Sequence, residues 1–162
     1  MEFQPSDIAE QSIPSPRFTQ AELTRYVRHE LSSHLYDDSA AAPEGIAIYW
    51  LSDPRDIRFV RYVGQTRAPR RRLLQHLNTA RLWLPDEKPW WIQSPKLRPL
   101  YEWIRQLYRD DRRLPVMVIS AWVDTTARAR VEERTRIIAC LEQDLPLFNV
   151  ETERLAEQIP LI

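Results

Sequence analysis

Glycine is almost absent from this chain, which has two in 162 residues against 13 prolines. A glycine-rich phosphate loop needs more glycines than that, so nucleotide binding of this kind is excluded. The single cysteine, Cys140, excludes an internal disulfide and is typical of a reducing compartment, so we expect a cytoplasmic location. The sequence has no Cys/His cluster with zinc-ligand spacing. It also has no histidine close to Cys140 that would favour a thiol nucleophile.

The chain has no excess charge of either sign, because 23 Lys and Arg residues balance 23 Asp and Glu residues. Any affinity for nucleic acid must therefore come from local basic patches. No apolar run approaches the length of about 18 residues that a membrane span needs. The polar, proline-bearing start is not typical of a secretory leader, and we expect none. The 43% of hydrophobic residues is enough for a packed core in one domain.

Residues 1–43 are predicted to form a tail followed by one amphipathic helix. Thr19 and Glu22 have the spacing of a capping box, and apolar residues then recur with helical period over residues 20–36. This helix is a candidate surface for a homodimer or a protein partner. Residues 37–44 read as a linker to the main domain.

Residues 44–152 are predicted to form the main domain, followed by a C-terminal tail over residues 153–162. Its pattern indicates the order β-β-α-α-β-α. The expected elements are strands at 46–51 and 58–63 with Gly64 ending the second, helices at 70–80 and 96–109, a strand at 114–123, a helix from Thr125 or Thr126 to about 141, an extended exit at 145–150 and a last helical turn at 151–158. The class is therefore α+β, a small three-stranded antiparallel sheet flanked by helices.

The strongest functional pattern lies in residues 47–76. Its parts are Ala47-Ile48-Tyr49, Tyr62-Val63-Gly64, and a helix with Arg72 and His76 four residues apart. Over roughly residues 46–149 the chain resembles the GIY-YIG nuclease family, which includes homing endonucleases, the incision domain of bacterial excision repair and several restriction enzymes. Ala47 replaces the first glycine of the family's motif. The resemblance implies a DNA endonuclease that hydrolyses phosphodiester bonds with Mg²⁺ or Mn²⁺.

The resemblance also implies catalytic roles for Tyr49, Tyr62, Arg72, His76 and Asn149. A tyrosine with a lowered pKa can act as a general base, and a guanidinium can bind the scissile phosphate. The imidazole could orient Tyr49 or shuttle a proton. Asn149 would donate or accept hydrogen bonds near the metal or the phosphate. Each residue also has an ordinary structural alternative: cross-strand packing for the tyrosines, a solvated basic run for the arginine, a core or surface position for the histidine and a turn for the asparagine.

The family's metal-binding glutamate falls on the third helix, where two registers compete. The apolar pair Ile137-Ile138 would align Arg134 with the glutamate, whereas a shift by one residue aligns Glu133. On a helical wheel Glu133 lies at the edge of a stripe that contains Val131. We therefore expect Glu133 to hold one Mg²⁺ through a single carboxylate and waters. The alternative is a catalytically inactive GIY-YIG-like module that binds DNA or a protein.

A basic run and two tryptophans are candidates for DNA contact. Arg67, Arg70 and Arg71 would bind backbone phosphates without reading sequence. Trp90 and Trp91 could stack on a base or wedge into a groove. The alternative is that at least one of these rings fills the core under a long loop.

Overall fold

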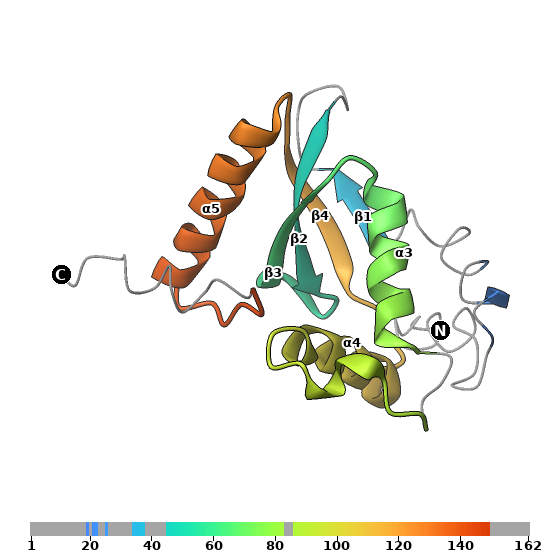
Figure 1. Cartoon of the computed structure of the whole chain (residues 1–162). Helices are drawn as coiled ribbons and strands as arrows, with labels where there is room; N and C mark the ends of the chain where they lie inside the picture. Colours follow the sequence, from blue (N-terminus) through green and yellow to red (C-terminus); the bar gives the residue numbers. More distant parts are fainter. Residues whose placement is uncertain are drawn as a thin grey trace, which may run out of the picture. The chain divides into compact units, whose positions relative to one another are not determined.

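The computed structural model describes residues 19, 21, 22, 25, 34–37, 45–82 and 86–149. The chain divides into two compact units, shown in Figure 1. We name Leu35–Pro69 with Val116–Ile162 the sheet unit, and Met1–His34 with Arg70–Pro115 the helical unit.

The sheet unit contains a four-stranded mixed sheet. Its strands are β1 (Leu35–Asp37), β2 (Ile46–Asp53), β3 (Asp56–Thr66) and β4 (Val116–Val123), in the order β1-β4-β2-β3. The predicted antiparallel pairing of β2 with β3 is confirmed, and β4 also pairs antiparallel with β2. The general α+β class is confirmed, but the expected three-stranded antiparallel sheet is wrong, because β1 adds a parallel strand beside β4.

The strand β1 also corrects the predicted end of the N-terminal helix. Leu35 and Tyr36 were expected in the last turn of that helix, but they pair with Met117 and Val118 of β4. Apolar and aromatic residues suit either structure over so short a segment, and pairing with a distant strand decides.

The start of the predicted N-terminal helix agrees with the structure. The Glu22 N–H donates to Thr19 Oγ1 (3.2 Å), and the Thr19 N–H donates to Glu22 Oε2 (3.3 Å), which confirms the capping box. Most of this helix, the linker at 38–44 and the predicted turn at 151–158 lie outside the described residues.

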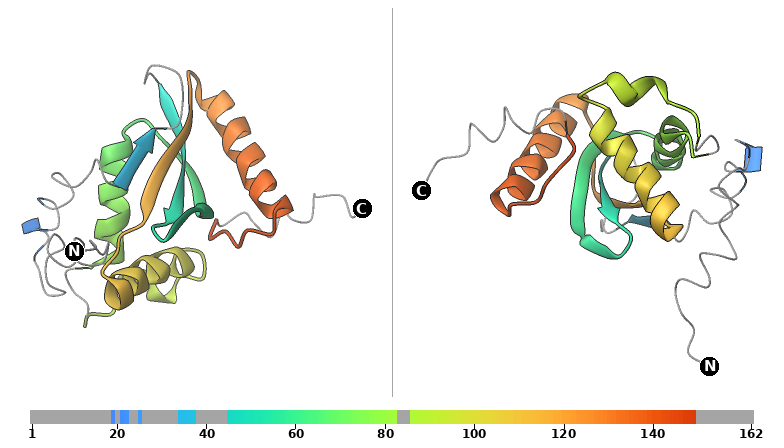
Figure 2. Two further views of the ribbon diagram at one scale, coloured as in Figure 1. Left: turned by 180° about the vertical axis from the view of Figure 1, so that it is seen from behind. Right: turned by 90° about the horizontal axis from the view of Figure 1, so that it is seen from below.

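Helix α5 (Thr126–Glu142) covers one face of the sheet, as both views in Figure 2 show. Of the two predicted start residues, Thr125 is the N-cap, since its Oγ1 accepts a hydrogen bond from the Arg128 N–H. Ile137 packs with Val63, and Ala129 packs with Ile48. Val131 was expected in this apolar stripe, but it is 63% exposed.

The helical unit contains α3 (Pro69–Ala80), the 3-10 turn η1 (Trp90–Gln93) and α4 (Arg98–Asp111). The two long helices lie where the sequence predicted them, within two residues at each end. Their buried residues recur with helical period: Leu73, Leu77, Leu100, Ile104 and Leu107. None of the described helices is both long and apolar enough to cross a membrane.

Candidate active site

Tyr49 on β2 lies directly opposite Gly64 on β3. The Tyr49 ring covers this glycine so closely that a Cβ at position 64 would lie 2.6 Å from the Tyr49 hydroxyl oxygen. Tyr49 is 1% exposed, and its ring centroid is 6.3 Å from that of Tyr62. The prediction that Gly64 ends the strand is wrong, because β3 continues to Thr66. Gly64 leaves room for the Tyr49 ring.

Glu133 lies on the side of α5 that faces the sheet. It is four residues after Ala129 and four before Ile137, both buried, so the three lie in one line along the helix. Its half-buried carboxylate accepts a hydrogen bond from Gln65 Nε2 on β3 (2.8 Å). Arg134, the residue in the competing register, is exposed. Of the two positions, Glu133 is the one directed at the sheet.

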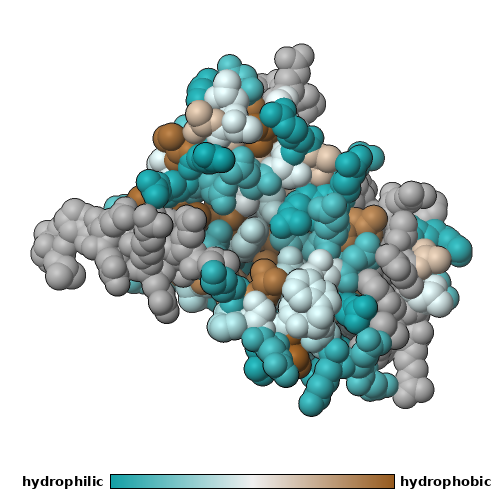
Figure 3. All heavy atoms as spheres, in the orientation of Figure 1, coloured by the Kyte–Doolittle hydropathy of each residue, from teal (hydrophilic) through white to brown (hydrophobic). Residues whose placement is uncertain are grey.

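Glu133 and Gln65 border a cavity of about 680 Å³ along α5. The same cavity is lined by Arg130 and Arg134. On the face drawn in Figure 3, most of the coloured atoms belong to hydrophilic residues. The cavity thus combines one carboxylate, one amide and two guanidinium groups.

The sheet lies between the two tyrosines and this cavity. Gln65 pairs with Ile48, whose side chain packs toward α5. Successive residues of a strand point to opposite faces, so Tyr49 and its partner Gly64 point to the other face. The phenols and the carboxylate therefore meet the same strand, β3, from opposite sides. The strand β3 lies at the edge of the sheet, and residues 148 and 149 hydrogen-bond to its outer side.

The donors at Glu133 fit a magnesium ion that keeps most of its waters. Within the described part of the chain, no group of three His, Cys, Asp or Glu side chains could enclose a metal. Mg²⁺ does not need such a cage, since it commonly binds through one or two carboxylates with water completing the shell. Glu133 and the amide oxygen of Gln65 are the groups that could hold it.

Asn149 binds the backbone of β3. Its Oδ1 accepts from the Val63 N–H (2.9 Å), and its Nδ2 donates to the Val63 carbonyl (2.6 Å). The preceding residue continues this pairing, because the Phe148 N–H donates to the Arg61 carbonyl. The side chain was expected to form hydrogen bonds near the metal or the phosphate. In the structure both ends of its amide hold the edge strand beside Gly64.

His76, in the helical unit, is fully buried. Its Nδ1 lies 3.3 Å from the Tyr101 hydroxyl oxygen. Burial, with a smaller effect of the Arg72 charge, lowers the pKa of His76 to about 3. An imidazole that stays neutral at physiological pH is a poor proton shuttle, so its contact with Tyr101 favours a positioning role. Arg72 is half-buried, and its guanidinium donates to Gln75 Oε1 (3.4 Å).

The predicted DNA-contact residues divide by exposure. Trp91 is 1% exposed, and its indole N–H donates to the Thr79 carbonyl. Trp91 therefore fills the core, and its prediction as a DNA-contact residue is corrected. Trp90 is 66% exposed. Arg67 in the sheet unit and Arg70 and Arg71 in the helical unit are exposed as well.

The predicted catalytic residues thus form separate groups within the two units. Tyr49 and Tyr62 are together in the sheet unit, as are Glu133 and Gln65, whereas Arg72 and His76 belong to the helical unit. Gln65 and Tyr101 were not predicted. Gln65 directly follows the Tyr62-Val63-Gly64 motif, which is a signal that could have identified it.

Comparisons of the chain with protein families, with curated proteins and with solved structures find no match.

Proposed function

We propose that this chain is a divalent-metal-dependent DNA endonuclease of the GIY-YIG type. The observation that carries the proposal is the direction of Glu133, which meets β3 beside the Tyr62-Val63-Gly64 motif through its hydrogen bond to Gln65.

In this proposal each group of residues has a chemical task. Glu133 and Gln65 would hold Mg²⁺, which would supply charge stabilisation at the phosphate. Arg72 binds the phosphate through its planar donor fork. Tyr49 takes the proton of the attacking water, and Tyr62 packs beside it. His76 is a positioning residue that holds α3 through its neutral contact with Tyr101.

The test is nicking of supercoiled plasmid by the full chain with Mg²⁺ or Mn²⁺. We expect Glu133→Gln to lower the nicking rate about 100-fold or more, since even outer-shell partners of a metal ligand are worth 10–100-fold. Arg72→Ala should cost about 10²–10³-fold, the usual effect of removing one donor to a developing oxyanion. Glu142→Gln, an exposed carboxylate on the same helix, is the matched control and should leave the rate unchanged. Absence of nicking by the wild type would refute the proposal.

A second candidate is a module that binds DNA without cutting it. The observation that favours it is the position of the sheet between the tyrosines and Glu133, which separates the proposed base from the proposed metal ligand. Salt-sensitive DNA binding without nicking, unaffected by Glu133→Gln, would support this alternative.

A further inference from the structure

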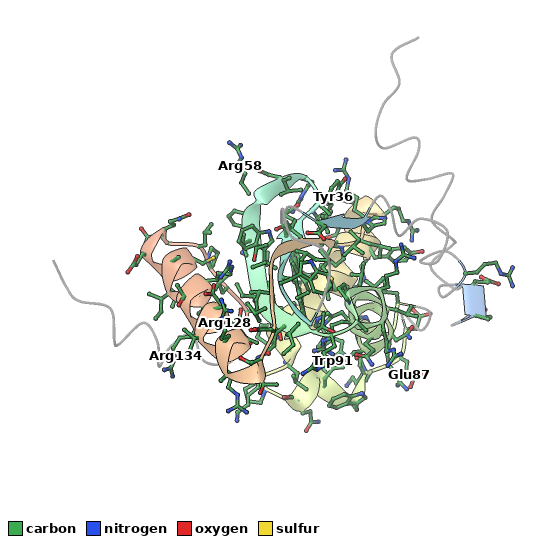
Figure 4. All side chains as sticks on the ribbon, turned by 90° about the horizontal axis from the view of Figure 1, so that it is seen from above. Tyr36, Arg58, Glu87, Trp91, Arg128 and Arg134 are labelled. Carbon is green, nitrogen blue, oxygen red and sulfur yellow. The ribbon has the colours of Figure 1, made fainter. Side chains whose placement is uncertain are left out.

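The four arginines of α5 are of two kinds. Arg128 is paired with Asp124 at 3.2 Å, and Arg136 is paired with Glu132; both pairs are four residues apart. The other two, Arg130 and Arg134, form no ion pair within the described part of the chain, and both are exposed. Figure 4 shows Arg134 extending away from α5.

The unpaired arginines are neighbours on the helix. Residues four apart lie on the same face, so Arg130 and Arg134 place two positive charges side by side, which destabilises an isolated helix. The ion pair between Arg136 and Glu132 on the same helix avoids this cost. A bound anion would offset the repulsion between the two guanidinium groups.

The same two arginines flank the proposed metal ligand. Arg130 follows Ala129 and Arg134 follows Glu133, so the arginine pair runs beside the buried line of α5, displaced by one residue. Both line the cavity that contains Glu133 and Gln65. The cavity is lined by two guanidinium groups and one carboxylate, so these groups give it a net positive charge. This charge attracts an anion.

We infer that Arg130 and Arg134 bind the phosphodiester backbone of a DNA strand along α5. The guanidinium fork matches the oxygens of a phosphate, and two forks four residues apart can hold successive contacts on one strand. These contacts are independent of base sequence, so they fix the position of the strand and leave specificity to other groups. That the anion is a DNA strand, and that the strand is held for cleavage at Glu133, rests on the proposed function; the excess of positive charge at the cavity does not.

The experiment measures binding of the full chain to a fluorescently labelled DNA duplex by anisotropy, in EDTA, over a series of salt concentrations. The slope of log K against log salt is negative, and each lost phosphate contact reduces its magnitude by about 0.9. The double variant R130A/R134A should therefore reduce the magnitude of the slope by about 1.8. The matched control is R98A/R128A, which removes two exposed arginines that are ion-paired at 2.8 Å and 3.2 Å. It should leave the slope near that of the wild type.

A second double variant, R130K/R134K, keeps the charge and guards against a folding defect. It should retain most of the wild-type slope, and a melting curve should show all three doubles folded. An unchanged slope for R130A/R134A, an equal loss in R98A/R128A, or no DNA binding by the wild type would each overturn the inference.

The outcomes separate this inference from the proposed function. If the wild type binds DNA but does not nick it, and R130A/R134A loses about two contacts, the endonuclease proposal fails and the phosphate contacts stand. If the wild type nicks DNA while R130A/R134A binds and nicks as well as it does, the arginine inference fails and the endonuclease proposal stands.

Discussion

His76 of the helical unit and Glu133 of the sheet unit are both polar side chains set in the apolar line of a helix. His76 lies between Leu73 and Ala80 and is 0% exposed, whereas Glu133 lies between Ala129 and Ile137 beside an open cavity. Burial, with a smaller effect of the Arg72 charge, lowers the pKa of His76 to about 3 and keeps the imidazole neutral. Glu133 keeps an acceptor directed at an amide and access to solvent. A polar residue on the inner face of a helix is thus a candidate for chemistry only where the structure leaves it a cavity.

His76 would resemble Glu133 in its access to solvent if its imidazole titrated like that of an exposed histidine. Because its pKa falls from 6.5 in the unfolded chain to about 3 in the folded one, the unfolded state binds a proton first. The free energy of unfolding should therefore have its maximum contribution from neutral His76 above pH 6.5, and it should fall as the pH drops from 6.5 to 3. His76 contributes about 1.4 kcal/mol of this loss for each pH unit, the largest effect predicted here.

Chemical denaturation across this pH range measures the effect. The variant His76→Gln has no ionisable group at this position. The slope of its free energy of unfolding against pH should therefore be smaller, by the amount that corresponds to one proton taken up on unfolding. Parallel curves for the two proteins, or an imidazole NMR titration of His76 with a midpoint near pH 6, would show that the site is open like that of Glu133.

Gly64 is a tightly packed position of the sheet unit, because the Tyr49 ring lies over it. Gly64→Ala would place a Cβ 2.6 Å from the Tyr49 ring, and this overpacking should cost about 1–3 kcal/mol. In a Tyr49→Ala background the same substitution should cost much less, because the ring is gone. The free energies of unfolding of the four proteins form a double-mutant cycle. Additive costs would mean that Tyr49 does not lie over Gly64.

Asn149 tests the edge of the sheet unit, where the smallest effect is expected. Asn149→Ala should lower the free energy of unfolding by about 1 kcal/mol, since the Val63 N–H and carbonyl lose their partners but water can reach an edge strand. Asn149→Asp keeps the acceptor for the N–H but sets a carboxylate against the Val63 carbonyl. Its stability should therefore improve as the pH falls through the carboxyl pKa and the group becomes a donor. This arrangement would be contradicted if the difference in free energy of unfolding between Asn149→Asp and the wild type were the same at pH 3 and at pH 7.

The local elements of the fold were predictable because their signals are local. The β2–β3 hairpin, the long helices and the caps at Thr19 and Thr125 follow from alternation, helical period and capping residues within a few positions. The strand β1 was not predictable, because three residues carry no period and their pairing with β4 is set by a distant segment. Gly64 was read as a strand end, because only the partner strand shows that a tyrosine ring lies over it.

The candidate site was predictable in residue types but not in arrangement. The helical wheel placed Glu133 at the edge of the apolar stripe because Val131 was counted as buried. In the structure Val131 is exposed, and the small residue Ala129 is the one that packs against the sheet. The burial of Trp91 depends on a carbonyl of α3 at Thr79 that receives its indole N–H. Such contacts join segments far apart in the sequence, and no spacing rule indicates them.

The parallel strand β1 has a practical consequence for anyone who shortens this protein. A chain trimmed to begin at residue 44 would keep Tyr49, Tyr62 and Glu133 but would remove β1, one of the two neighbours of β4. It would also remove Asp37, whose carboxylate accepts the Trp122 indole N–H. The backbone of β4 would then present an uncovered row of donors and acceptors, a template on which one molecule can recruit another into aggregates. A truncation that retains Leu35–Asp37 keeps that row paired.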